Sequence, residues 1–171
     1  MGLIEFVHGT YIHKRRILVL SDWCVRLIPP NSKVLDVGCG DGHLTRLIAN
    51  TRPDVSIFGI DVLQRPNPTM PVEVFDGRSI PYEDNSFDVL MFADVLHHTE
   101  QPMTLLREAV RVSRQAVLIK DHSVEGTLAY PTLRLMDWIG NARHGVSLPY
   151  NYWTRAKWQH ALHNLNLSIE S

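Results

Sequence analysis

The sequence predicts a doubly wound α/β fold, and two of its features carry that prediction. Short apolar runs recur along the chain, and most of them are separated by segments whose apolar residues have helical spacing. Strands that are apolar on both faces and connected through helices form a parallel sheet covered on both sides, with right-handed crossovers. A length of 171 residues suits one domain with one core. We therefore expect a single domain over residues 1–171.

The central part of the chain alternates strands and helices. Apolar, β-branched runs predict strands at 33–37, 55–61, 72–75, 87–93 and 116–121. Apolar residues repeat every three or four positions in segments 17–28, 43–50 and 103–112, which are expected to be helices. The first helix should end before the Pro29-Pro30 pair, because proline cannot continue a helix. The core of the domain is expected over about residues 30–121.

The last third of the chain departs from this alternation. Residues 122–152 place glycines and prolines between aromatic residues, so we expect an inserted lid or acceptor-binding region there. A helix is expected over 153–165, and residues 166–171 should begin one further strand. We expect the chain to be truncated after that helix, because a sheet with an unpaired edge is prone to aggregation.

Composition and charge argue against several kinds of partner. Lys and Arg total 17 against 18 Asp and Glu, and the net charge of -1 provides no field toward nucleic acid, so we expect no nucleic-acid partner. No apolar stretch approaches the roughly 20 residues of a membrane span. The chain shows no secretory signal pattern, and its two cysteines lack CxxC spacing, so we expect a cytoplasmic protein.

The glycine-rich stretch "VLDVGCGDG", residues 34–42, follows the first predicted strand. Ligands of open parallel sheets bind at the carboxyl ends of strands, where glycines let backbone N–H groups approach an anionic ligand. Asp61 ends the second strand, where a carboxylate can accept hydrogen bonds from ribose hydroxyls. A dinucleotide and S-adenosylmethionine both satisfy these requirements. The D-x-G-x-G-x-G run, formed by Asp36, Gly38, Gly40 and Gly42, favours S-adenosylmethionine over the G-x-G-x-x-G dinucleotide pattern.

Three further stretches occur in a fixed order after this run: "FGID", "FDGRSIPYEDNSFDVLMFADVLHH" and "LLREAVRV". With them, about residues 10–121 resemble the class I S-adenosylmethionine-dependent methyltransferases, in particular the type 11-like subgroup that acts mostly on small molecules. The resemblance implies a Rossmann-like sheet that lacks part of the family's C-terminal antiparallel hairpin. It also implies S-adenosylmethionine as cofactor, S-adenosylhomocysteine as product and a small-molecule acceptor. The family's Pro-Gly-Gly turn before the fifth strand is replaced by "SRQA" at 113–116.

The resemblance also implies which residues hold the cofactor. Asp61 would bind the ribose hydroxyls, with Val62 and Leu63 beside the adenine, and Asp76 and Gly77 would lie at the adenine edge. The methionine end and the transferable methyl would be surrounded by Tyr11, Arg16, Asp36, Gly38, Cys39, Gly40, Gly42, Ala93, Asp94 and His97.

Three histidines are candidate catalytic residues. His97 and His98 follow the fourth strand and His122 follows the fifth, so all three should lie at the carboxyl edge of the sheet. A histidine can remove the proton of an acceptor at neutral pH, whereas the alternative role is a loop histidine bonded to a backbone carbonyl. Methyl transfer from a sulfonium depends mainly on alignment, and the two adjacent histidines lack a third ligand at a recognisable spacing. We therefore expect no metal.

Other functions stay open at this point. A nicotinamide-dependent oxidoreductase would use a similar sheet, and a module that binds the cofactor without catalysis would share every motif. The aromatic residues of 130–158, together with Arg134, Arg143 and His144, are consistent with an acceptor pocket. Alternatively, Leu133, Met136, Trp138 and Ile139 form the apolar face of a lid helix.

Overall fold

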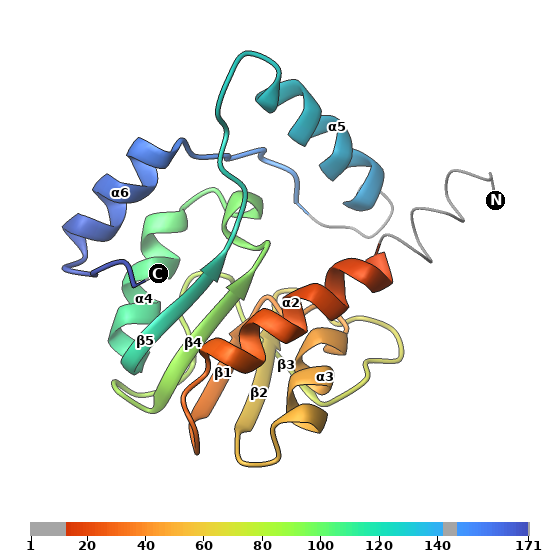
Figure 1. Ribbon diagram of the computed structural model, residues 1–171, viewed down its shortest axis with the longest axis vertical. Helices are drawn as coiled ribbons and strands as arrows, with labels where there is room; N and C mark the ends of the chain where they lie inside the picture. The colour runs from red at the N-terminus through yellow and green to blue at the C-terminus, as the bar shows by residue number, and fades with distance from the viewer. Residues whose placement is uncertain (1–12, 142–146, 171) are drawn as a thin grey trace.

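The protein forms a five-stranded parallel sheet in the computed structural model, which describes residues 13–141 and 147–170 (Figure 1). The strands are β1 (Lys33–Val37), β2 (Ser56–Asp61), β3 (Val72–Val74), β4 (Phe87–Ala93) and β5 (Ser113–Lys120). Their order is β3-β2-β1-β4-β5, and every neighbouring pair is parallel. The chain moves outward from β1 to β3 and then crosses to β4, so the carboxyl ends of β1 and β4 flank the switch point where such folds bind ligands.

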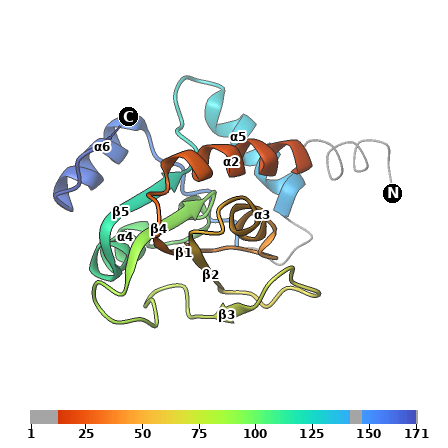
Figure 2. The same ribbon diagram turned by 60° about the horizontal axis from the view of Figure 1, so that its bottom comes forward.

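Helices cover both faces of the sheet, as the sequence predicted. On one face lie α2 (His13–Leu27) and α3 (His43–Thr51), whereas α4 (Pro102–Val112) covers the other (Figures 1 and 2). Two buried clusters follow from this arrangement. One joins Leu105 and Leu106 of α4 to the sheet, and the other joins Leu44 and Ile48 of α3 to the opposite face. The doubly wound architecture is therefore confirmed.

The fifth strand begins at Ser113 and not at residue 116, where the sequence analysis placed its start. The chain leaves α4 directly into β5, because Ser113 adopts an extended conformation at the helix end, with φ -87° and ψ 144°. Ser113 pairs with Phe87, and an irregular register between Phe87 and Val89 absorbs the early start of the strand. The polar segment that replaces the family's turn therefore extends the edge strand.

The C-terminal third forms two helices above and beside the sheet. Helix α5 (Ala129–Asn141) lies beyond the carboxyl ends of the strands, and α6 (Arg155–Asn164) lies on the side of α4 (Figure 1). The apolar residues predicted for a lid helix do lie on α5, but Met136, Trp138 and Ile139 are exposed and Leu133 is half-buried. The only α5 residue buried in the described part of the chain is Asp137. This helix therefore presents a carboxylate, and not an apolar face, to the rest of the protein.

The expected strand after α6 is not formed in residues 166–170. The backbone N–H of Leu167 instead bonds the carbonyl of Leu162 at 3.0 Å, and Asn166 takes a positive φ of 56°. These features close the end of α6 and turn the chain back on the helix. Among the described residues, no helix combines the length and apolar character needed to cross a membrane.

Candidate cofactor and active site

A cavity of about 470 Å³ opens at the carboxyl ends of the strands, and we call it the strand-end cavity. Eight residues predicted to form the site line it: Gly38, Gly40, Asp61, Val62, Leu63, Asp76, Gly77 and His98. Sequence reasoning missed ten other lining residues: Arg65, Phe75, Arg78, Val95, Thr99, Glu100, Gln101, Leu105, Asn141 and Ser147. Most of these lie in loops or on helices α4 and α5, where no local pattern signals an approach to the cavity.

The glycines of the turn after β1 serve different purposes, although all three have positive φ. A Cβ on Gly38 would lie 2.6 Å from the side chain of Val95, and one on Gly42 would lie 2.5 Å from Met70. A Cβ on Gly40 would meet nothing within 4 Å, and Gly40 lines the strand-end cavity. Packing within the protein therefore excludes side chains at Gly38 and Gly42, while Gly40 leaves space for a ligand.

Asp61 is held in a fixed orientation at the end of β2. Its Oδ2 accepts a hydrogen bond of 2.8 Å from the backbone N–H of Gly40, and its Oδ1 accepts one of 2.8 Å from Leu63. Each carboxylate oxygen has two lone pairs, so both can accept a further hydrogen bond from a ligand. Because Asp61 also lines the strand-end cavity, its geometry fits a ribose with adjacent hydroxyls.

Asp76 marks the neighbouring wall of the same cavity. Its Oδ1 accepts hydrogen bonds from the backbone N–H groups of Ser79 at 2.7 Å and Arg78 at 2.8 Å. These bonds lower the pKa of Asp76, so the carboxylate is ionised at neutral pH. Gly77 follows with a φ of 75°, and a Cβ there would lie 2.9 Å from Val62. An ionised acceptor at this wall fits the amino group of an adenine.

Some residues predicted to bind the cofactor do not line the strand-end cavity. Asp36 is buried beneath the glycine turn, where the hydroxyl of Thr45 donates to its carboxylate at 2.5 Å and burial raises its pKa to about 7. The sulfur of Cys39 lies against Gly59. These two residues, like Gly42, shape the turn from behind. Tyr11 lies outside the described residues.

Ala93, Asp94 and Arg16 lie together at the end of β4, outside the lining of the cavity. Asp94 has a φ of 60°, and its carboxylate pairs with Arg16, Lys120 and His122. Although burial opposes ionisation, the charges of Arg16 and Lys120 outweigh it and lower the pKa of Asp94. Asp94 therefore ties α2 to the ends of β4 and β5.

The three predicted histidines come together near this point. His97 and His98 lie on the short helix η2 (Leu96–His98), with ring centroids 4.0 Å apart, and the ring of His122 is 5.1 Å from that of His97. The ring of Tyr152 stacks on His97 at 5.4 Å. His98 lines the strand-end cavity, while His97 is buried behind it. The predicted catalytic role of the three histidines stays a prediction.

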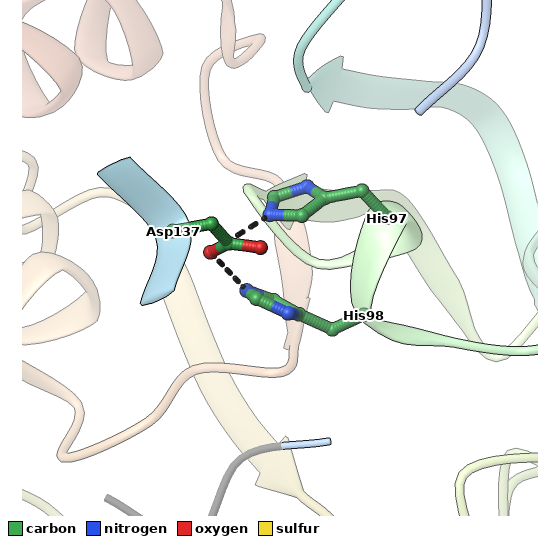
Figure 3. Close-up of side chains that lie close together, drawn as sticks. All are labelled: His97, His98 and Asp137. Carbon is green, nitrogen blue, oxygen red and sulfur yellow. Dashed lines mark ion pairs between the residues drawn. The ribbon is translucent and has the colours of Figure 1, made fainter. Parts of the chain in front are cut away.

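Two carboxylates flank His97, and the sequence indicated neither of them. Nδ1 of His97 donates to Oδ1 of Asp121 at 2.6 Å, and Nε2 lies 3.6 Å from Oδ1 of Asp137 on α5 (Figure 3). Burial lowers the pKa of His97, but the two carboxylates outweigh it and raise that pKa to about 9. For His98 and His122, by contrast, burial lowers the pKa below the ordinary value. The three histidines therefore differ in charge at neutral pH.

Comparison with known proteins agrees with this fold. A family model described as "Methyltransferase domain" matches residues 35–119. The 2-methyl-6-phytyl-1,4-hydroquinone methyltransferase of Synechocystis is 25% identical over 163 residues, which cover 89% of this chain and 43% of that protein. The 27-O-demethylrifamycin SV methyltransferase of Amycolatopsis mediterranei is 31% identical over 110 residues, which cover 56% of this chain and 40% of that protein. The chain thus spans less than half the length of these relatives.

Solved structures share the fold at low sequence identity. The YcgJ protein of Bacillus subtilis has a TM-score of 0.66 and 20% identity, over 91% of this chain and 69% of that one. A SAM-dependent methyltransferase from Aquifex aeolicus has a TM-score of 0.62 and 17% identity, and the match covers 92% of this chain and 89% of that one. The chain belongs to the class I S-adenosylmethionine-dependent methyltransferases, and the cofactor of this family is S-adenosylmethionine.

Proposed function

We propose that this protein transfers the methyl group of S-adenosylmethionine to a hydroxyl of a small-molecule acceptor. The observation that carries the proposal is the fixed carboxylate of Asp61, which faces the strand-end cavity beside the open space at Gly40. The bound cofactor supplies a methyl group on a sulfonium, which is a good leaving group. The acceptor gains this methyl group and loses a proton, and S-adenosylhomocysteine is the other product.

The residues of the cavity divide the work of binding and orientation. Asp61 accepts hydrogen bonds from the ribose hydroxyls, and Asp76 accepts one from the adenine amino group. Gly40, which has no side chain, leaves space for the methionine end of the cofactor. Because in-line transfer depends on alignment, these fixed contacts are the protein's main contribution to the rate. A histidine among His97, His98 and His122 is proposed to assist removal of the acceptor's proton.

Aromatic side chains around the histidines support a small, partly apolar acceptor. Tyr152 is buried against His97. The ring centroids of Tyr130 and Tyr150 lie 5.9 and 6.4 Å from the ring centroid of Tyr152. These rings lie outside the lining of the strand-end cavity, which combines the apolar side chains of Phe75, Val95 and Leu105 with a few polar groups, as is typical of small-molecule sites. The names of two relatives refer to a hydroquinone and to a demethylrifamycin, which is consistent with an acceptor of this kind.

Parallel calorimetric titrations with S-adenosylhomocysteine, S-adenosylmethionine and NADH test the proposal. We expect micromolar binding of the first two and no binding of NADH. A preference for NADH would favour the oxidoreductase alternative and contradict the proposal. Release of S-adenosylhomocysteine should then be measured with a panel of phenols and quinols. Cofactor binding without turnover on any of them would favour a non-catalytic module.

A further inference from the structure

Three potential ligand atoms converge beside the strand-end cavity. Nε2 of His97 and Nε2 of His98 lie 3.6 and 3.5 Å from the same oxygen, Oδ1 of Asp137 (Figure 3). The three atoms all lie within 4.8 Å of one another, although the histidines come from η2 and Asp137 from α5. We propose that His97, His98 and Asp137 bind a divalent transition-metal ion such as Zn²⁺.

The spacing of these atoms suits coordination better than hydrogen bonding. Hydrogen bonds between nitrogen and oxygen are about 2.7 to 3.2 Å long, and both of these separations are longer. Metal–ligand bonds of about 2.1 Å place the ligands of a tetrahedral ion about 3.4 Å apart. The observed separations of 3.6 and 3.5 Å are close to that edge length.

The other ring nitrogens determine the chemistry of the converging atoms. Nδ1 of His97 lies 2.6 Å from the carboxylate of Asp121, and Nδ1 of His98 lies 3.2 Å from the backbone carbonyl of Ser147. Carboxylates and carbonyls only accept hydrogen bonds, so each Nδ1 carries a hydrogen and Nε2 is the ring nitrogen left for a metal ion. The proton that the flanking carboxylates hold on Nε2 of His97 would leave when an ion binds. With an ion bound, the two Nε2 lone pairs and the carboxylate oxygen would all face a single cation, which would satisfy all three atoms.

A second layer of contacts holds the proposed ligands in place. Asp121 is fixed by the backbone N–H groups of Leu96 at 2.8 Å and His122 at 2.6 Å. Asp137 accepts a hydrogen bond of 2.9 Å from the hydroxyl of Tyr152 and one of 2.7 Å from the amide of Asn141. Histidine ligands of metal sites characteristically donate their second N–H to a carboxylate or carbonyl in this way.

Charge and donor type indicate the kind of ion. Asp121 and Asp137 bring two carboxylates into a buried cluster, which favours a divalent cation. Two imidazoles and one carboxylate suit Zn²⁺, Co²⁺ or Fe²⁺, whereas Mg²⁺ prefers oxygen ligands. Three protein ligands leave a coordination position open, as in catalytic metal sites.

The location of the site suggests its use, and this step rests on the proposed function. His98 and Asn141 line the strand-end cavity, so the ion would border the space available to an acceptor. A hydroxyl oxygen bound to the ion would lose its proton more easily and would be oriented for transfer. His97 and His98 would then act as ligands, which leaves His122 for proton removal.

Metal binding is tested on the wild-type protein without cofactor or acceptor. After treatment with a chelator, the protein is titrated with Zn²⁺ and Mg²⁺ by calorimetry and with Co²⁺ by visible absorption. We expect one tight Zn²⁺ per chain, strong visible Co²⁺ bands and much weaker Mg²⁺ binding. Failure to bind Zn²⁺ at micromolar concentration, or a preference for Mg²⁺, would overturn the proposal even if S-adenosylhomocysteine binds normally.

Variants locate the ion. Asp137→Asn keeps the shape of the side chain but removes the charge, so Zn²⁺ affinity should fall at least 100-fold. His160→Gln is the matched control, because His160 is an exposed histidine on α6 and its loss should leave affinity unchanged. Circular dichroism checks that each variant is folded. If Asp137→Asn does not fold, His98→Gln takes its place, and the same loss of Zn²⁺ affinity is expected. Unchanged affinity in the folded ligand variant would place the ion elsewhere and refute the assignment.

Discussion

At the scale of single residues, the carboxylate of Asp61 decides how strongly the cofactor binds. Asp61→Ala removes the acceptor for the ribose hydroxyls, and a hydrogen bond to a charged group contributes about 1.5 to 3 kcal/mol. We therefore expect the Kd for S-adenosylhomocysteine to rise about 10- to 150-fold in calorimetry. Asp41→Ala is the matched control, because Asp41 is exposed in the same turn and does not line the strand-end cavity. Equal affinity of the Asp61 variant and wild type would show that the ribose assignment is wrong.

Gly40 separates the effect of space from the effect of backbone strain. Gly40→Val forces a β-branched residue into a φ of 62° and projects its side chain into the strand-end cavity. Gly126→Val imposes similar strain at a φ of 83° in open space outside that cavity. Both variants should lose about 1 to 2 kcal/mol of stability in urea unfolding. Only Gly40→Val should also weaken S-adenosylhomocysteine binding, by at least tenfold, and equal weakening in both would contradict the role given to Gly40.

Among the elements, the central strands β1 and β4 were the most predictable because their residues are buried on both faces. The apolar run that became β1 was predicted with its exact bounds, and Val34, Leu35 and Val37 are fully buried there. Edge elements were less predictable. Ser113 and the residues after it are polar and resemble a turn, yet pairing with β4 makes them part of a strand. At the edge of a sheet, pairing with the neighbouring strand decides the conformation, and the local sequence does not predict that pairing.

The side chain of Arg52, directly after α3, adds hydrogen bonds to the apolar packing between α2 and α3. Its guanidinium donates to the carbonyl of Val25 at 2.7 Å and to that of Ile28 at 2.9 Å, at the C-terminal end of α2. It also pairs with Asp54 at 2.7 Å. Arg52→Ala leaves these carbonyls without their donor, so we expect the free energy of unfolding to fall by about 2 to 3 kcal/mol in urea.

The control for Arg52 is Arg26, which forms an exposed pair with Asp22 within α2. Exposed pairs of this kind contribute about 0.3 to 0.5 kcal/mol. The free energy of unfolding should therefore fall less in Arg26→Ala than in Arg52→Ala. Equal losses in the two variants would show that the bridge from Arg52 to α2 does not stabilise the fold. Arg52→Lys should recover only part of the loss, because an ammonium cannot reproduce the planar arrangement of donors.

At the scale of the whole molecule, the sequence indicated one wall of the site and missed the other. The wall formed by Gly40, Asp61 and Asp76 follows from residues at the ends of consecutive strands, whose positions the parallel topology fixes. The position of Asp137, which lies beside the cavity and does not line it, depends on how α5 returns over the sheet. Asp137 lies between the exposed apolar residues Met136 and Trp138, and nothing in its neighbourhood along the chain indicates burial. Long-range docking of this kind leaves no periodic signal in a single sequence.

The stability of the whole molecule should depend on pH through Asp36. Burial raises its pKa from 3.8 to about 7, so the folded state favours a protonated carboxyl, whereas the unfolded chain ionises near pH 4. Stability linked to Asp36 is therefore complete below pH 4 and is lost as the pH rises to about 7. Asp36→Asn stays neutral and can still accept the hydrogen bond from Thr45.

We accordingly expect Asp36→Asn to gain stability relative to wild type as the pH rises from 4 to 7. The relative gain should reach roughly 2 to 4 kcal/mol above pH 7, since each pKa unit corresponds to about 1.4 kcal/mol. Urea unfolding at several pH values measures it, with Asp22→Asn as an exposed control that should show no such trend. If the difference between Asp36→Asn and wild type were constant across this range, Asp36 would already be ionised in the folded protein, and the account of it as a neutral group beneath the glycine turn would fail.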